Sequence, residues 1–242
     1  MINNRFENTE DVKNFFENLT QSLEKENRFF PDKRLRESID ELLKCKTATK
    51  ELVKGEILYR ARIYDKNKDT NLNKEPCFKG YDKAGSTIDI NNPWPNAGRM
   101  NPEGIHVLYV STGEKTCAKE LGIAANEKVS IAKMKVQRNL KVVDFPKLAR
   151  KLRNKKKKKF AQCINNVLSK GYGGRTYVFP QYIAMYCKYL GYDGIMYRSK
   201  YANKNDNQTG MNIAIFNYEN CIPIASDIMT VKKASLEFEK KQ

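Results

Sequence analysis

The chain has 242 residues and a formal net charge of +17, because 45 lysines and arginines outnumber 28 aspartates and glutamates. No stretch approaches the ~18 consecutive apolar residues of a membrane-spanning helix, and the first residues lack the apolar segment of a secretory signal. We therefore expect a cytoplasmic protein without membrane association. The excess positive charge attracts polyanions or phosphate-bearing small molecules, although lysine runs such as residues 155–159 are usually only solvated.

The N-terminal region predicts a helical hairpin. Apolar residues recur at helical spacing over residues 10–29, and Thr9 is the expected N-cap. Pro31 ends this helix, and a second amphipathic helix begins at Asp32. We expect the hairpin to form a small appendage, residues 1–52, packed on the domain that follows.

The next segments predict a strand and a long polar connection. Residues 56–63 have the pattern of a strand that carries Arg60 and Arg62 on one face. Residues 64–97 are polar and close with Pro-Trp-Pro, and a connection of that length is often a lid over a functional site. A disordered insertion is the alternative.

Residues 53–242, which include this strand and this connection, are expected to form one domain of mixed strands and helices. A capping box at Ser111–Glu114 predicts a helix that runs to about Gly122. No regular strand–helix–strand alternation is present, which favours an α+β fold over a doubly wound one. The other predicted elements are strands at 104–110, 127–136, 140–144, 193–197, 211–217 and 222–226, and helices near 146–170 and 180–190.

Several kinds of catalytic site are excluded by the composition. The one histidine, His106, falls in a predicted strand and gives no basis for a Ser–His–Asp triad or a histidine-based metal cluster. Six cysteines without a C-x-x-C pair favour free thiols, and metal ligation by scattered cysteines is the weaker alternative. The glycine-rich residues 171–175 match neither common nucleotide-binding pattern and predict a turn. We therefore expect no metal.

Three segments form an ordered set of motifs: LYRAR at 58–62, GRMNPEGIHVLYVSTGEKTCAKE at 98–120 and GYDGIMYRS at 191–199. MNIAIF at 211–216 follows them. Together these segments resemble the blocks of the RES domain family, which is named for its Arg, Glu and Ser and is found in bacterial toxin–antitoxin systems. The resemblance extends over residues 55–218 and leaves the N-terminal hairpin outside it.

The resemblance implies an ADP-ribosyltransferase-like core of two packed β-sheets with surrounding helices, which binds NAD in a cleft. Transferred residue by residue, the catalytic roles fall on Arg60, Tyr109, Glu120 and Ser199. The NAD-binding roles fall on Arg60, Arg99, Asn101, Tyr109 and Ser199.

These residue types suit the chemistry of NAD cleavage. Nicotinamide leaves NAD as a neutral base, so its departure needs no general acid, in agreement with the single histidine. Glu120 can stabilise an oxocarbenium-like ribose, and Arg60 and Arg99 can hold a pyrophosphate by bidentate contacts. Tyr109 offers an aromatic wall, and Ser199 a hydrogen bond to the ribose or the nicotinamide amide. Taken singly, each residue also suits an ordinary structural position.

We therefore expect an NAD-consuming enzyme that cleaves the nicotinamide–ribose bond as an NAD phosphorylase or glycohydrolase. NAD is its substrate and inorganic phosphate a candidate co-substrate. The resemblance further implies a growth-inhibiting toxin of a toxin–antitoxin or defence system, with a separate antitoxin that occludes the site. The alternatives are a mono-ADP-ribosyltransferase with a protein acceptor, or a basic nucleic-acid-binding module, which no nucleic-acid motif supports. A homo-oligomer is left open, and Arg62 and Gln181 are secondary site candidates.

Overall fold

The computed structural model describes residues 7–27, 33–45, 48–69, 75–122, 124, 126–170, 177–202 and 210–230. The predicted helix break at Pro31, the helix start at Asp32 and the turn at 171–175 lie outside the described residues. No described helix has the length and apolar character needed to cross a membrane.

The core is one eight-stranded sheet in the order β1-β5-β6-β7-β3-β2-β4-β8. All neighbouring strands are antiparallel except β5 and β6. Each predicted strand is present, and the predicted α+β class is confirmed. The strands are β1 (Thr49–Leu52), β2 (Ile57–Ile63), β3 (Leu108–Ser111), β4 (Lys128–Val136), β5 (Leu140–Asp144), β6 (Gly194–Arg198), β7 (Met211–Ile215) and β8 (Cys221–Thr230).

The sheet is nearly divided in two between β2 and β3. These strands share a single residue pair, Tyr59 with Ser111, whereas β2 pairs with β4 from Ile57 to Ile63. Beyond Tyr59 the two strands therefore separate and leave a gap between the two halves of the sheet. The two packed sheets implied by the resemblance are thus joined into one hydrogen-bonded sheet whose halves diverge.

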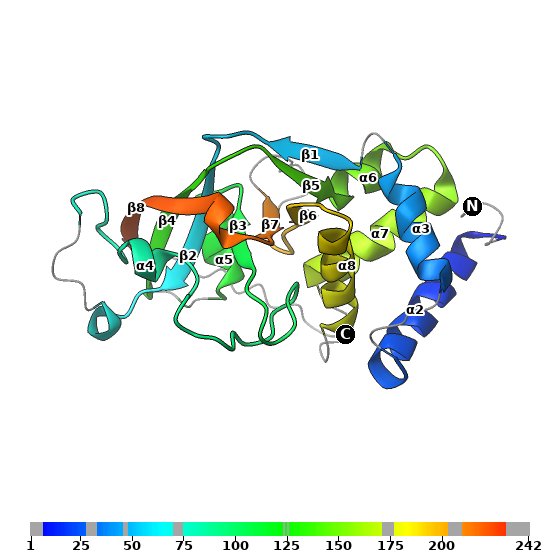
Figure 1. Ribbon diagram of the computed structural model, residues 1–242, viewed down its shortest axis with the longest axis horizontal. Coiled ribbons are helices and arrows are strands. Elements are labelled where there is room, and N and C mark those ends of the chain that lie inside the picture. The colour runs from blue at the N-terminus through cyan, green and yellow to red at the C-terminus, as the bar shows by residue number, and fades with distance from the viewer. Residues whose placement is uncertain are drawn as a thin grey trace, which may run out of the picture.

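Helices cover both halves of the sheet (Figure 1). In Figure 1, α2, α3, α7 and α8 gather at the end of the molecule away from β8, while α4 and α5 lie with β2, β4 and β8. The helices are α2 (Thr9–Lys25), α3 (Lys33–Leu43), α4 (Lys83–Ser86), α5 (Glu114–Glu120), α6 (Phe145–Lys151), α7 (Lys155–Lys170) and α8 (Val178–Tyr189), with 3-10 turns η1 (Lys66–Lys68) and η2 (Tyr218–Asn220).

The N-terminal hairpin shares its apolar core with the rest of the protein. Phe16 of α2 packs on Phe179 of α8 and Phe160 of α7, with ring centroids 4.5 and 6.2 Å apart. Buried residues of α2 and α3 belong to the same cluster as those of α6, α7 and α8. The strand β1, which the sequence did not predict, also joins the sheet beside β5. The boundary at residue 52 stays a prediction.

Two predicted helix starts are wrong. Asn8, rather than Thr9, caps α2, since its side chain accepts bonds from the backbone of Glu10 and Asp11. The capping box at Ser111 does not form, and Gly113 precedes α5 without a side-chain cap. Ser111 instead ends β3, where its hydroxyl donates a hydrogen bond to the Asn212 side chain of β7.

The polar connection at 64–97 is anchored to the sheet over part of its length. Phe78 forms a parallel bridge with Ser226 of β8, and the backbone of Tyr81 donates to the Ser130 hydroxyl of β4 at 2.8 Å. The backbone of Gly80 approaches so closely that a Cβ atom there would lie 2.3 Å from the Ser130 hydroxyl. This part of the expected lid is therefore fixed; movement of the remainder stays a prediction.

Candidate active site

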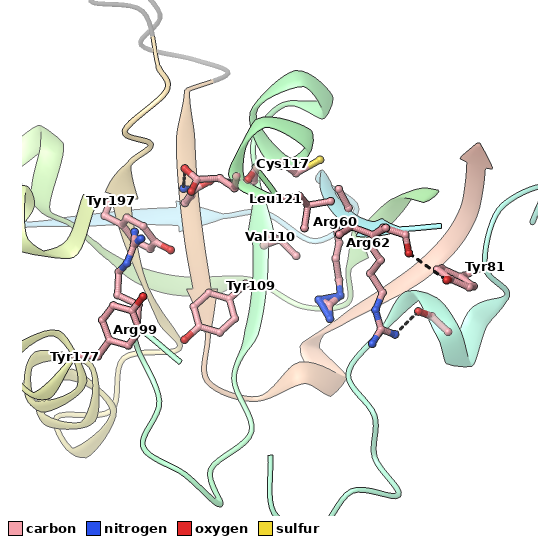
Figure 2. Close-up of a pocket in the computed structure, with 16 residues that line it drawn as sticks. Arg60, Arg62, Tyr81, Arg99, Tyr109, Val110, Cys117, Leu121, Tyr177 and Tyr197 are labelled. Carbon is pink, nitrogen blue, oxygen red and sulfur yellow. Dashed lines mark hydrogen bonds between the residues drawn. The ribbon is translucent and has the colours of Figure 1, made fainter. Parts of the chain in front are cut away.

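A cavity of about 710 Å³ opens where β2 separates from β3 (Figure 2). Its lining comes from both halves of the sheet, from α5, from the turn before β3 and from the start of α8. Four of the six predicted site residues line it: Arg60, Arg99, Tyr109 and Glu120. A volume of this size lies within the range of small-molecule sites.

Glu120 enters the cavity from the last turn of α5. This helix packs its Cys117 and Leu121 against β2 and β4, which brings the carboxylate to the gap between the sheet halves. The Oε1 atom of Glu120 accepts one bond from the Ser199 hydroxyl at 2.6 Å and another from the Asn212 side-chain amide at 2.7 Å. Both bonds end on one oxygen, so the carboxylate is held in a fixed orientation.

The carboxylate network continues into the sheet. Asn212 is 5% exposed, and its Oδ1 accepts a 2.6 Å bond from the Ser111 hydroxyl, so its amide nitrogen must point toward Glu120. Ser111 and Asn212 are direct partners in the β3–β7 register. The position of Glu120 is thus set by β3, by β7 and by the segment directly after β6, which supply its direct and indirect partners.

The strand β2 contributes two guanidinium groups to the cavity. Arg60 and Arg62 point the same way from the strand, as the predicted alternation requires (Figure 2). Arg62 donates to the Gly85 carbonyl of α4 at 2.6 Å. The buried Nε of Arg60 has no hydrogen-bond partner among the described residues. Burial, with a smaller contribution from the charge of Arg62, lowers the pKa of Arg60 to about 10.

Arg99 lines the cavity near Tyr177 and Tyr197, on the far side of Tyr109 from Arg60 (Figure 2). Its Nη1 donates to the carbonyls of Leu168 and Ser169 at the end of α7, at 3.1 and 2.8 Å. Arg99 thus also has a structural role, because its Nη1 binds the end of α7. The predicted role, anion binding, did not include this contact. Its Nε is nonetheless buried without a partner among the described residues.

Tyr109 lies between Arg99 and Arg60 in the cavity (Figure 2). Its hydroxyl donates to the Asn101 side chain at 2.7 Å and accepts from the Met100 backbone at 2.8 Å. Burial raises the pKa of Tyr109 to about 12 although the Met100 bond and the charge of Arg99 oppose this. The phenol is therefore a neutral, fixed wall of the cavity.

Two predicted site residues do not line the cavity. Ser199 is 3% exposed and reaches the site through its bond to Glu120. Asn101 is 4% exposed and supports Tyr109 from behind, with its amide nitrogen bound to the Asn96 and Pro102 carbonyls. Both side chains are buried behind the residues that they hold, and their direct contact with NAD stays a prediction.

His106 and the lysine run at 155–159 also lie apart from the cavity lining. His106 precedes β3 instead of lying within it, and its Nε2 is 3.3 Å from the Asp89 carbonyl. The lysines form the first turns of α7, where Lys157 pairs with Glu41 at 2.9 Å. Neither feature contributes a group to the cavity.

Sequence reasoning missed Asn212, Tyr177 and Tyr197 as site residues. Asn212 carried a usable signal, since an amide inside the otherwise apolar strand MNIAI calls for a buried partner. Tyr197 is 4% exposed in β6, and Tyr177 is 45% exposed just before α8. Nothing local distinguishes these tyrosines from the other tyrosines of the chain.

The cavity has an excess of positive charge. Among the described lining residues, three arginines face a single carboxylate, Glu120, and no histidine is present. The described part of the chain holds no group of three or more histidine, cysteine or acidic side chains that could bind a metal ion. Cys117 lines the cavity, but burial raises the pKa of its thiol to about 12, so it stays protonated. The arrangement suits an anionic ligand that presents a cationic centre to Glu120.

The sequence matches the family model of the RES domain over residues 78–232, well over half of the chain. This span includes Arg99, Tyr109, Glu120 and Ser199 but begins after β2, so Arg60 lies outside it. No curated protein matches. A solved structure titled "Crystal structure of the M.tuberculosis MbcT-MbcA toxin-antitoxin complex" aligns at 16% identity and a TM-score of 0.45, over 82% of this chain and 93% of that chain. The chain, whose fold is α+β, therefore belongs to the RES domain family.

Proposed function

We propose that the cavity binds NAD and that the protein cleaves its nicotinamide–ribose bond. The observation that carries this proposal is the presence of opposite charges in one cavity. A rigidly held carboxylate, Glu120, lines the same cavity as two guanidinium groups, Arg60 and Arg62, that pair with no carboxylate among the described residues. NAD supplies both complements, because its pyrophosphate is anionic and its reacting ribose becomes cationic in the transition state.

Arg60 and Arg99 are the proposed pyrophosphate contacts. Each has a buried Nε that lacks a partner in the described structure, and burying such a donor is unfavourable unless a ligand accepts its hydrogen bond. Arg62 adds a second charge beside Arg60 and is oriented by the Gly85 carbonyl. Tyr109 and Tyr177 would offer flat surfaces to the rings of the dinucleotide.

Glu120 would stabilise the ribosyl cation as nicotinamide leaves. The C1′–N bond breaks with its electron pair going to the pyridine nitrogen, so nicotinamide departs neutral and needs no proton. Since Ser199 and Asn212 both bind Oε1, the second carboxylate oxygen stays available for the ribose. A carboxylate fixed in advance is most effective where charge develops, because it need not reorient during the reaction.

Inorganic phosphate is the acceptor that the cavity favours. No second carboxylate or histidine stands among the described lining residues to deprotonate water, whereas an anionic phosphate oxygen attacks C1′ without a base. The three lining arginines can hold this extra anion together with the pyrophosphate. Water gives a glycohydrolase and a protein side chain gives a mono-ADP-ribosyltransferase; both use the same site and differ in product.

Membership of the RES family extends the proposal to a biological role. The resemblance implies a growth-inhibiting toxin that depletes cytoplasmic NAD, and a separate antitoxin protein that covers the cavity. Expression of the chain should therefore stop growth, and the Glu120→Gln variant should not. The oligomeric state is not needed for this proposal.

The test is direct. Purified protein is mixed with NAD, with and without inorganic phosphate, and nicotinamide and the ribosyl product are followed by NMR. We expect nicotinamide release that depends on phosphate and falls at least ~100-fold in Glu120→Gln, in line with the loss of a fixed electrostatic stabiliser. Glutamine keeps an Oε1 acceptor for Ser199 and Asn212, so this variant should retain its fold. Release without phosphate dependence would indicate hydrolysis, and no release would contradict the proposal.

A further inference from the structure

Gln181, in the first turn of α8, makes two hydrogen bonds to a turn of the chain that lies before β3. Its Nε2 donates to the Gly98 carbonyl at 2.8 Å and to the Asn101 carbonyl at 3.0 Å. A side-chain amide nitrogen carries two hydrogens, so both are used on this turn. Gln181 itself does not line the cavity.

The turn from Gly98 to Asn101 is closed and tightly packed. The Gly98 backbone donates to the Asn101 carbonyl at 2.9 Å. A Cβ atom at Gly98 would lie 2.3 Å from Asn101 Oδ1 and 2.7 Å from the Tyr109 hydroxyl, so a glycine is needed for this approach. The turn therefore packs directly against the phenol and leaves no space for a side chain at Gly98.

This turn supplies both partners of Tyr109 and also carries Arg99. The Met100 backbone and the Asn101 side chain each form one hydrogen bond with the Tyr109 hydroxyl, and Arg99 reaches from the same turn to the end of α7. A shift of the turn would move the aromatic wall and one of the cationic groups together. The two bonds from Gln181 connect this assembly to α8, whose next turns are buried in the main core.

We infer that Gln181 is a positioning residue for substrate binding, acting through the Gly98–Asn101 turn on Tyr109 and Arg99. The inference rests on the proposed function, since these two side chains are assigned to NAD. It assigns no role to Gln181 in bond cleavage, because Glu120 is held by Ser199 and Asn212, which belong to other elements. Loss of Gln181 should therefore raise KM and leave kcat nearly unchanged.

Gln181→Met tests this inference, because methionine has a similar length and no donors. Removing both donors leaves two carbonyls without their partner, and we expect KM for NAD to rise about tenfold with kcat within about twofold of the parent. Tyr182→Phe is the matched control on the same helix. It removes a buried hydroxyl that has no partner among the described residues, and it should change neither constant.

A binding measurement separates this inference from the proposed function. NAD is titrated by calorimetry into Glu120→Gln, and into the same variant carrying Gln181→Met, with circular dichroism to verify the fold. If Glu120→Gln does not bind NAD, the proposed function fails. If it binds NAD and the added Gln181→Met change leaves Kd unaltered, the inference about Gln181 is overturned. Should Gln181→Met not fold, Gln181→Glu replaces it, with an equal or larger expected loss because its carboxylate would face two carbonyl oxygens.

Discussion

The two halves of the sheet support the charged groups of the cavity in opposite ways. On the side of β3, β6 and β7, Glu120 is bound by Ser199 and Asn212, and Asn212 is bound in turn by Ser111. On the side of β2, the buried Nε of Arg60 has no partner among the described residues, and the neighbouring charge of Arg62 adds repulsion. The Glu120 carboxylate thus has hydrogen-bond partners within the protein, whereas the Arg60 Nε has none among the described residues.

The difference indicates which side is complete before a ligand arrives. A carboxylate with fixed donors is preorganised for its role and gains little by rearranging. A buried guanidinium without an acceptor is unfavourable in the free protein and becomes favourable when an anion binds. The β2 side therefore presents a buried donor that a bound anion would satisfy, while the β3 side sets the geometry of the carboxylate.

The largest expected effect tests the unsatisfied side. Arg60→Met should lower kcat/KM for NAD by about 100-fold or more, through loss of the proposed pyrophosphate contact. It should also raise the melting temperature by a few degrees, since it removes a buried Nε donor with no partner among the described residues. Nicotinamide release and calorimetric melting measure the two effects. A variant that loses stability together with activity would contradict our description of this side.

Arg62→Met is the matched control for that change. Arg62 already donates to the Gly85 carbonyl, so its removal leaves an acceptor of α4 without a partner. We expect a smaller loss of activity and no gain in melting temperature. Equal thermal gains in both variants would mean that the absent partner of Arg60 is not the cause.

The second prediction tests the preorganised side. Ser199→Ala removes one of the two bonds to Glu120 Oε1 and should lower kcat by about 10- to 100-fold, the range for a hydrogen bond to a charged group. In a Glu120→Gln background the same change should have little further effect, because both substitutions act on one group. Additive losses in the double variant would show that Ser199 acts separately from Glu120.

A smaller effect is expected at Tyr109. Its hydroxyl is engaged with Asn101 and Met100, so Tyr109→Phe should lower kcat less than about fivefold while costing about 1–2 kcal/mol of stability. Tyr109→Ala, which removes the ring as well, should mainly raise KM. A loss above about 100-fold in Tyr109→Phe would assign the hydroxyl a chemical role that its two bonds argue against.

The smallest expected effect is on stability at alkaline pH. Burial raises the pKa of Tyr109 from the ordinary tyrosine value of 10.0 to about 12, so between these values the unfolded chain has lost a proton that the folded protein keeps. Stability must therefore fall as the pH rises from 10 toward 12. Melting temperatures at about pH 9, 10 and 11 should decline less steeply in Tyr109→Phe than in the parent, by a few degrees. Parallel curves would contradict the raised pKa.

The sequence alone predicted most elements because their signals are local. The apolar spacing of residues 10–29 identified α2, and short β-rich runs identified β2, β4 and β7. It did not predict β1, whose four residues carry too short a pattern and are defined by their pairing with β5. Ser111 shows the same limit, since its local spacing favours a helix cap while its partner Asn212 lies 101 residues away.

By itself, the sequence determined which chemical groups the site can contain: one carboxylate, arginines and tyrosines in motifs of the RES family, from a chain with a single histidine. Only the tertiary structure decided how those groups are used. It placed Ser199 and Asn101 behind the cavity lining, and brought Asn212 and Gln181 into supporting positions. The physical reason is that burial and hydrogen-bond partnership are set by strands and helices far apart in the chain, whereas residue type and spacing report only on near neighbours.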